Sequence, residues 1–229
     1  MTVPISLAEA YPVLGLRITA GPVELTGADD DTLIALANLA VQGIHASDAM
    51  PFLVPWTLRP ADSFHLDYVQ YHWGIRSRFA PGGWTLDLAV RYDGELVGSQ
   101  GVGTKDFLVT RTGETGSWLG RRYQGRGIGT LMRQAICAFL FDHLDFEEVT
   151  SAAFVDNAAS NAVSRKVGYR PNGIVRKLRG RPADDPEGGD EVAAEQLYVL
   201  APQDLVRGPD LIVEGAGPVR ALIGLSTAT

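Results

Sequence analysis

The chain has 229 residues and a formal net charge of −7, from 20 basic and 27 acidic side chains. This length predicts one domain with additions and allows a core that needs no disulfide or structural metal. An acidic chain lacks the basic face that phosphate-backbone binding requires, so nucleic acid is not an expected partner. The single cysteine, Cys137, excludes an internal disulfide and a multi-cysteine zinc cluster.

The sequence also lacks the signals of a membrane protein. No apolar run reaches the roughly 18 residues of a membrane span, and residues 1–20 lack the basic start and apolar stretch of a secretory signal. A lone cysteine fits a reducing compartment. We therefore expect a cytoplasmic protein with no membrane partner.

The first half of the chain predicts four strands and two helices. Three aspartates at 29–31 are typical N-terminal residues of a helix, and Asp93-Gly94 is a typical hairpin turn. The expected elements are strands 13–19 and 23–25, a helix to about 41, a helix of about 62–79, and hairpin strands 86–92 and 95–102. Antiparallel strands therefore come before the glycine-rich segment.

The second half predicts alternating strands and helices. The expected elements are strand 112–120, a helix from 128 to at least 140, strand 148–155, a short helix capped by Asp156 or Asn157 and ended by Gly168, and strands 169–175 and 194–200. Apolar residues in the first helix recur at helical spacing, which predicts one face buried on a sheet: Ile128, Leu131, Met132, Ala135, Ile136, Phe139 and Leu140.

The ends of the second half are less regular. Residues 179–191 are rich in Gly, Pro and Asp and are expected to be a mobile connector. We divide the chain into a domain of residues 1–207 and a C-terminal tail of residues 208–229. The tail is apolar enough at 222–225 to dock on another surface.

Acidic residues avoid two long stretches. Residues 116–141 and 157–183 contain no Asp or Glu, yet they carry 11 of the 20 Lys and Arg residues. Chance clustering on a solvated face would explain either stretch alone. Two such stretches flanking a glycine-rich segment favour a bound polyanion.

That segment reads Gln124-Gly125-Arg126-Gly127-Ile128-Gly129-Thr130. A glycine loop that opens a helix presents unpaired N–H groups and the positive end of the helix dipole, so it favours a phosphate group. A nucleotide P-loop would need Lys and Ser or Thr after the last glycine, and the sequence continues Thr130-Leu131. A dinucleotide fingerprint would need Gly or Ala at 130 and a βαβ unit, which the preceding hairpin disfavours.

A third phosphate motif fits every position. Gln124-x-x-Gly127-x-Gly129 is similar to the pyrophosphate motif of the GNAT superfamily of acyl-CoA N-acyltransferases. Residues 116–119, and Asn157 with Ser160, Asn161 and the later Gly168-Tyr169, resemble signatures of its RimJ/RimL-like branch, which acetylates ribosomal-protein N-termini. The resemblance covers about 84–200. It implies a mixed α/β fold, with a mostly antiparallel sheet of about seven strands flanked by helices.

The resemblance also implies a binding site for acyl-CoA. A strand equivalent to Ser117, Trp118 and Leu119 would bind the pantetheine arm, with Asn157 and Ser160 contacting the arm from a facing helix. The amides of Gln124 to Thr130 would bind the pyrophosphate; that set is Gln124, Gly125, Arg126, Gly127, Ile128, Gly129 and Thr130.

Two residues are candidates for catalysis. Many members have a tyrosine seven residues after the asparagine to protonate the leaving thiolate, and Ser164 stands there in this chain. We take Ser160 as the substitute, with helix capping as the alternative. Glu114 is the candidate general base, with an ion-paired strand glutamate as the alternative. A backbone N–H near Leu119 would stabilise the thioester oxyanion.

Four aromatic residues lie in segments that flank the acceptor site in similar enzymes: Phe52, Trp56, Trp73 and Trp84. Packing is the alternative for each. The four histidines show no metal-site spacing, and we expect no metal. Cys137 falls on the buried side of its helix, and we expect it to be inert.

The sequence therefore predicts an N-acyltransferase that moves an acyl group from acyl-CoA to a small-molecule or peptide amine by direct attack. Acetyl-CoA is the expected donor. Succinyl-CoA is the alternative because Arg170, Arg176, Lys177, Arg179 and Arg181 could favour an acidic acyl group. The alternative function is a catalytically idle acyl-CoA sensor. A homodimer is expected from the family resemblance and the apolar tail.

Overall fold

The computed structural model describes residues 5–180 and 191–226, and all structural statements concern these residues. The strands are β1 (Arg17–Ala20), β2 (Val23–Gly27), β3 (Thr85–Tyr92), β4 (Glu95–Gly103), β5 (Thr112–Leu119), β6 (Glu148–Phe154), β7 (Arg170–Arg179), β8 (Glu191–Leu200) and β9 (Leu211–Glu214). The α-helices are α1 (Leu7–Ala10), α2 (Asp30–Val41), α3 (Phe64–Ser77), α4 (Phe107–Thr110), α5 (Ile128–His143), α6 (Ala158–Val167) and α7 (Ala216–Leu222).

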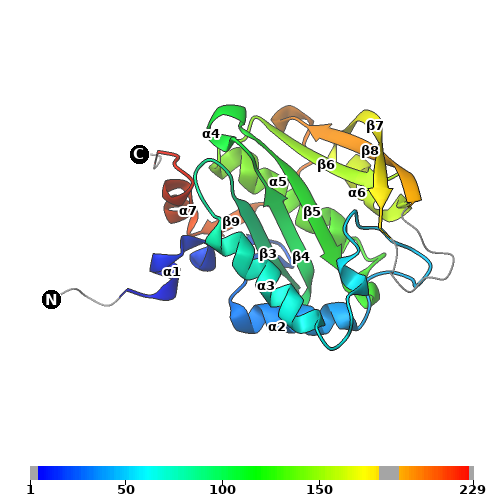
Figure 1. Cartoon of the computed structure of the whole chain (residues 1–229). Helices are drawn as coiled ribbons and strands as arrows, with labels where there is room; N and C mark the ends of the chain where they lie inside the picture. The colour runs from blue at the N-terminus through cyan, green and yellow to red at the C-terminus, as the bar shows by residue number, and fades with distance from the viewer. Residues whose placement is uncertain (1–4, 181–190, 227–229) are drawn as a thin grey trace.

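Within the described residues, nine strands form one sheet in the order β7-β8-β6-β5-β4-β3-β2-β1-β9. Only β5 and β6 pair in parallel among these neighbours. Helices α2 and α3 cover one face, and α5 and α6 cover the other (Figure 1). The predicted mixed, mostly antiparallel sheet flanked by helices is confirmed, with two more strands than the approximate number expected.

The predicted elements differ from the structure at one expected strand and in several short elements that were not predicted. The expected strand 13–19 begins as a 3-10 turn, Pro12–Gly15, because proline has no N–H to donate and fits the first position of a turn. The short helices α1, α4 and α7 and the strand β9 were not predicted. Most of the expected mobile connector lies outside the described residues, and β7 and β8 extend into its two ends.

The expected tail docks on the domain. Strand β9 pairs with β1, and Val219 and Ile223 are fully buried in the main core. The apolar residues of the tail are therefore explained by contacts within the chain. One of the two grounds for predicting a homodimer disappears with this finding.

Helix α5 occupies the centre of its face of the sheet. Residues of its predicted apolar stripe, including Ile128, Ile136, Phe139 and Leu140, are fully buried. Burial of each such side chain contributes roughly 1.5–3 kcal/mol. This packing fixes the helix against the sheet and so fixes the glycine loop that precedes it.

No helix in the described part of the chain combines the length and the hydropathy needed to span a bilayer.

Gly168 ends α6 with φ of +105°, and a Cβ there would lie 2.0 Å from the carbonyl oxygen of Asp204. We predict that Gly168→Ala destabilises the fold by more than about 2 kcal/mol in urea unfolding, because backbone strain and a clash add. Gly173→Ala is the matched control, since φ is +103° and nothing lies within 4 Å. It should cost about 1 kcal/mol. Equal losses would contradict this account.

Candidate active site

Strands β5 and β6 separate after four paired residues. Their parallel pairing runs from Thr112 opposite Glu148 to Thr115 opposite Ser151 and then ends, although β5 continues to Leu119 and β6 to Phe154. The two strands therefore form a V-shaped opening between 116–119 and 152–154, which we call the fork. At about 3.3 Å per residue, the β5 side of the fork is roughly 13 Å long.

The β5 edge of the fork carries backbone groups with no strand partner. The N–H of Gly120 donates to the carbonyl of Val97 in β4. Alternate residues of an antiparallel strand face opposite neighbours, so Leu119 and Ser117 direct their N–H and C=O groups into the fork. The predicted oxyanion donor is a backbone N–H near Leu119, and the N–H of Leu119 itself faces the fork.

The glycine loop lies between the end of β5 and the start of α5. Gly125 and Gly127 have φ of +71° and +82°, and a Cβ on either would meet nothing within 4 Å. Their positions are therefore open on the outer side, where a ligand could approach the backbone. Glycine is favoured there because other residues rarely adopt positive φ.

The loop presents unpaired donors. Among the described residues, the backbone N–H groups of Gly125, Arg126 and Gly127 have no hydrogen-bond acceptor, and neither does the first N–H of α5. The side chains of Arg121 and Arg126 are exposed and make no ion pair with the described residues. Unpaired amides at a helix N-terminus beside two free guanidinium groups favour a phosphate group.

Gln124 has a different position from the other loop residues. Its side-chain amide donates to the carbonyls of Ile44 at 2.6 Å and Leu119 at 2.9 Å. The side chain therefore fastens the loop to the end of β5 rather than pointing outward. Gln124 fixes the angle between the fork and the loop.

Helix α6 begins at the other side of the fork. Asn157 is its N-cap, and its Oδ1 accepts from the N–H of Ser160 at 3.1 Å. Asn161 binds the carbonyl of Phe154 at 2.8 Å and accepts from the Tyr198 hydroxyl at 2.8 Å, so it ties α6 to β6 and β8. The Ser160 hydroxyl has no hydrogen-bond partner in the described chain, so only its N–H serves the cap.

Glu114 lies on the opposite face of β5 from the α5 contacts, together with Trp118. Glu114 keeps an exposed surface, but partial loss of solvation, followed by the negative charge of Glu195, raises the pKa of its carboxyl, and Lys177 opposes the shift. A carboxylate with a raised pKa is a stronger base than an ordinary glutamate. The alternative was an ion-paired strand glutamate, but Glu114 forms no salt bridge with a described residue.

The predicted acceptor residues divide into two pairs. The Trp56 ring lies 5.8 Å from Trp118 of the fork and 5.3 Å from Phe52, measured between ring centroids, so Trp56 reaches the fork and Phe52 packs on Trp56. Trp73 is exposed and donates to Asp30 at 3.1 Å. Trp84 is buried between Phe79, Phe107 and Phe146, and the structure gives it a packing role.

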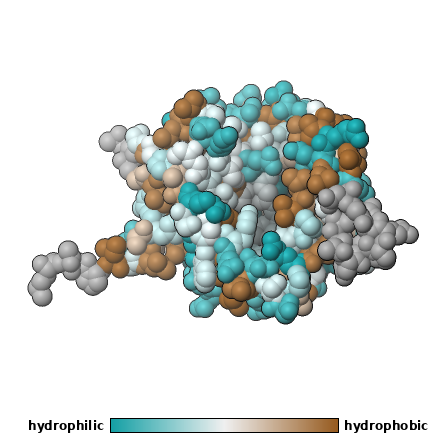
Figure 2. Space-filling model, in the orientation of Figure 1, coloured by the Kyte–Doolittle hydropathy of each residue, from teal (hydrophilic) through white to brown (hydrophobic). Residues whose placement is uncertain are grey.

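The loop that carries Phe52 and Trp56 meets the β7–β8 hairpin. A Cβ on Gly180 would lie 2.9 Å from Pro55. Exposed apolar side chains are present in both segments, including Leu53, Val54, Ile174 and Val192. Figure 2 shows hydrophobic surface at the upper right, where β7 and β8 lie in Figure 1.

Two of the basic residues that were expected to favour an acidic acyl group already form ion pairs within the chain. Arg179 pairs with both carboxylate oxygens of Asp156, at 2.7 and 2.8 Å, and with Glu191 at 3.1 Å. Arg170 pairs with Asp204 at 3.1 Å. Arg181 lies outside the described residues. The carboxylates paired with Arg170 and Arg179 therefore reduce the attraction of these residues for an acidic acyl group.

Arg133 is the functional candidate that sequence reasoning missed. It is only 3% exposed and lies in α5 beneath the fork. Burial of a guanidinium without a carboxylate costs several kcal/mol unless other groups offset it. The sequence signal was its place at the edge of the apolar stripe, four residues after Gly129 and three before Ile136, where a charged side chain must be buried.

Cys137 is fully buried, and burial raises the pKa of its thiol to about 11. It lies 3.3 Å from the Tyr169 hydroxyl, which contacts Thr115 at 2.9 Å. Ser164, at the position of the family tyrosine, is fully buried, and its hydroxyl has no partner in the described chain. It therefore has no access to the fork.

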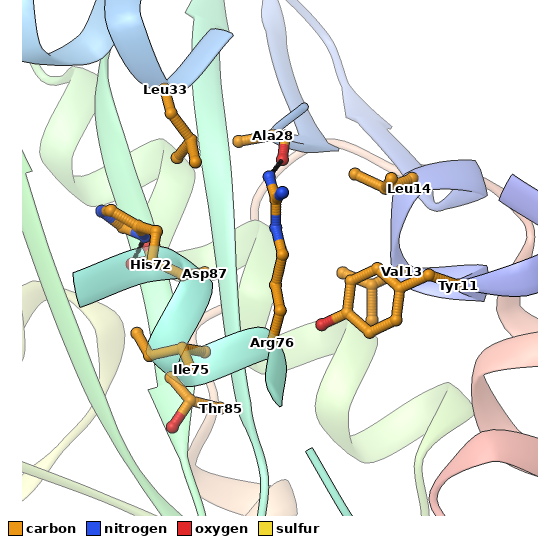
Figure 3. Close-up of a pocket in the computed structure, with 10 residues that line it drawn as sticks. All are labelled: Tyr11, Val13, Leu14, Ala28, Leu33, His72, Ile75, Arg76, Thr85 and Asp87. Atoms are coloured by element: carbon orange, nitrogen blue, oxygen red, sulfur yellow. Dashed lines mark hydrogen bonds and ion pairs between the residues drawn. The ribbon is translucent and has the colours of Figure 1, made fainter. Parts of the chain in front are cut away.

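A small cavity of about 20 Å³ lies elsewhere, between α3 and the N-terminal segment (Figure 3). His72 and Asp87 pair at its wall at 3.2 Å, and Arg76 crosses it to the carbonyl of Ala28. This volume is just large enough to hold about one water molecule. The cavity is therefore packing space and no substrate site.

The described residues contain no group of three His, Cys, Asp or Glu side chains arranged to bind a metal ion.

A fork between parallel strands, leading to an amide-rich loop at a helix N-terminus, has the geometry that suits an extended ligand with a phosphate end. Residues 25–170 match the family described as acetyltransferase (GNAT) domain. The chain therefore belongs to the GNAT acetyltransferase family.

Individual proteins are similar to this chain, one in sequence and two in fold. The chain is 30% identical over 91 residues to "Putative ribosomal N-acetyltransferase YdaF" of Bacillus subtilis, a match that spans 40% of this chain and 49% of the relative. RimL, a ribosomal L7/L12 α-N-protein acetyltransferase in complex with coenzyme A, superposes with a TM-score of 0.62 at 20% identity over 80% of this chain and 95% of RimL. Mycobacterium smegmatis RimJ, in complex with CoA-disulfide, gives 0.61 at 21% identity over 90% and 92%.

The start of α6 holds a structural cap, Asn157, and a serine hydroxyl, Ser160, that takes no part in capping. We predict that Asn157→Ala lowers the free energy of unfolding by about 1 kcal/mol, because an N–H of the first turn loses its acceptor. Ser160→Ala keeps that N–H and should change stability by less than about 0.5 kcal/mol. Urea unfolding measures both. A large loss in Ser160→Ala would show that its hydroxyl is structural.

Proposed function

We propose that this protein transfers an acetyl group from acetyl-CoA to an amine, with the cofactor lying in the fork and its pyrophosphate on the glycine loop. The observation that carries the proposal is that the fork continues directly into the glycine loop. The free edge of 116–119 leads directly to the unpaired amides of the loop. An extended arm with amide groups can add to that edge as a strand, and a phosphate can follow at the helix N-terminus.

The amine would approach from the opposite face of the sheet. That face carries Glu114 and the aromatic residues Trp118, Trp56 and Phe52. An α-amine with a pKa near 7.7 costs about 1 kcal/mol to deprotonate at pH 7, whereas a lysine-like amine with a pKa near 10.4 costs about 4.6 kcal/mol. A base with a raised pKa therefore supports either acceptor and matters most for the second.

The transfer needs no covalent enzyme intermediate. The amine nitrogen attacks the thioester carbon, and the N–H of Leu119 stabilises the oxyanion. The carbon–sulfur bond then breaks, and the electron pair goes to sulfur. The proton of the attacking nitrogen passes to Glu114, directly or through water. Ser160 donates a hydrogen bond to the departing sulfur.

The acceptor class follows the relatives. RimL is named as an α-N-protein acetyltransferase of L7/L12, and YdaF as a ribosomal N-acetyltransferase. We propose a peptide or protein N-terminus as the acceptor, and the apolar surface around the β7–β8 hairpin supports a peptide. A cytoplasmic location and a homodimer stay predictions, the second now resting on family resemblance alone.

Gly127→Glu tests the binding site. A carboxylate against the pyrophosphate should reduce CoA binding by at least about a hundredfold in calorimetry, since like charges at a helix N-terminus repel. Gly94→Glu is the matched control, because Gly94 is an exposed hairpin glycine with the same φ of +82° and open surroundings. It should bind CoA normally.

Unchanged affinity in Gly127→Glu would overturn the site. Tight CoA binding by the wild type, with no thiol release from acetyl-CoA on any peptide or small amine, would favour the idle sensor.

The general base Glu114 should determine how kcat/KM falls at acidic pH. A general base works only when deprotonated, so kcat/KM should fall as the pH drops through the raised Glu114 pKa and be restored above it. Glu114→Gln should lose that limb and reduce the rate about a hundredfold at neutral pH. Glu148→Gln, at an exposed glutamate at the start of β6, serves as the control. An unchanged profile in Glu114→Gln would exclude Glu114 as the base.

A further inference from the structure

Arg133 forms four hydrogen bonds beneath the fork, all to neutral groups. Its Nη1 donates to Thr115 at 3.2 Å and Ser151 at 3.1 Å, its Nε to Gln100 at 3.2 Å, and its Nη2 to Ser117 at 2.7 Å. No carboxylate of the described chain pairs with it. An arginine side chain stays charged in a protein interior. A full positive charge is therefore buried with no counter-charge.

The position of this charge relates it to the fork. Thr115 and Ser151 are the last paired residues of β5 and β6, so Nη1 lies at the base of the fork. Ser117 is the next residue of β5 on the same face and lies within the fork. The Ser117 hydroxyl accepts from Arg133, so its own proton is free to donate. Helix α5 and the glycine loop lie on this face as well.

We propose that Arg133, acting through the Ser117 hydroxyl, stabilises the thiolate that leaves when the acyl group is transferred. This inference rests on the proposed function. When the carbon–sulfur bond breaks, the electron pair stays on sulfur, and Ser117 donates a hydrogen bond to it without giving up its proton. The thiolate then takes its proton from solvent on release, and the proton of the amine leaves through Glu114.

The chemistry of the site requires such a charge. A serine hydroxyl is a much weaker acid than a thiol, so neither Ser117 nor Ser160 can protonate the thiolate. The position of the family tyrosine holds the buried Ser164, which has no access to the fork. A fixed positive charge in a site of low dielectric stabilises a developing anion without proton transfer. Arg133 is thus a positioning and electrostatic residue, and Ser117 on β5 would touch sulfur in addition to Ser160 on α6.

The other ionisable groups around the fork do not replace Arg133. On its own face, Cys137 and Tyr169 are buried, and burial raises the pKa of each, so both stay neutral near pH 7. On the opposite face are Glu114, Glu195 and Lys177, and the two carboxylates would disfavour a thiolate. Arg133 is therefore the buried cation nearest the base of the fork within the described chain.

The experiment measures the ionisation of CoA bound to the full-length protein. The thiolate absorbs in the ultraviolet where the thiol does not, so a pH titration of the complex gives the pKa of the bound thiol. In the wild type this pKa should lie at least one unit below the value of about 8.5 for a free thiol. Arg133→Met should remove the shift and lower kcat at least tenfold, with KM for acetyl-CoA changed less than threefold.

Further variants separate electrostatics from packing. Ser117→Ala retains Arg133 and should lose most of the shift, which keeps the test available when Arg133→Met does not fold. Arg133→Lys keeps the charge and should retain part of the shift. Ser164→Ala, which removes a buried hydroxyl with no described partner, should leave the thiol pKa unchanged.

Each outcome has a distinct meaning. A bound thiol that titrates identically in the wild type, Arg133→Met and Ser117→Ala overturns the role of Arg133, while acetyl transfer by the wild type would still stand. Failure of the wild type to bind CoA overturns the proposed function and this inference together. Binding with a shifted pKa but no turnover supports the Arg133 interaction and contradicts the proposed enzyme.

Discussion

The separation of β5 from β6 after Thr115 is the constraint on which the site depends. Up to that residue, the two strands satisfy each other's backbone groups in a parallel ladder. Beyond it, the Leu119 carbonyl accepts from the Gln124 side chain. The other fork-facing groups of β5 have no strand partner in the described chain and can be satisfied by water or a ligand, since unpaired backbone groups away from water are costly. The same separation places Ser117 and Leu119 in the opening and leads the chain into the glycine loop.

The neighbouring elements keep the fork open and oriented. Asn161 ties α6 to the end of β6, Gln124 ties the loop to the end of β5, and α5 packs its apolar face on the sheet between them. Arg133 crosses the base of the fork and binds Thr115 and Ser151, where the pairing of the two strands ends. The proposed ligand-binding positions are thus held by side chains that would not touch the ligand, which is how a site is preorganised.

Much of this arrangement could be predicted from the sequence, because it depends on local patterns. The apolar spacing of α5, the glycine loop and the cap at Asn157 each act within a few residues. The role of Trp84, the docking of the tail and the environment of Arg133 depend on residues far apart in the chain, so local patterns could not reveal them. Pro12 was a local signal, and it marked the turn that replaced the start of an expected strand.

The most direct measurement of the central claim is a crystal structure of the protein with an acetyl-CoA analogue that resists transfer. The account predicts the pantetheine arm along Ser117 to Leu119 as an added strand, the pyrophosphate on the amides of Gly125 to Gly127, and the sulfur within hydrogen-bond distance of the Ser117 hydroxyl. A cofactor bound at any other surface, with the fork filled only by water, would contradict it.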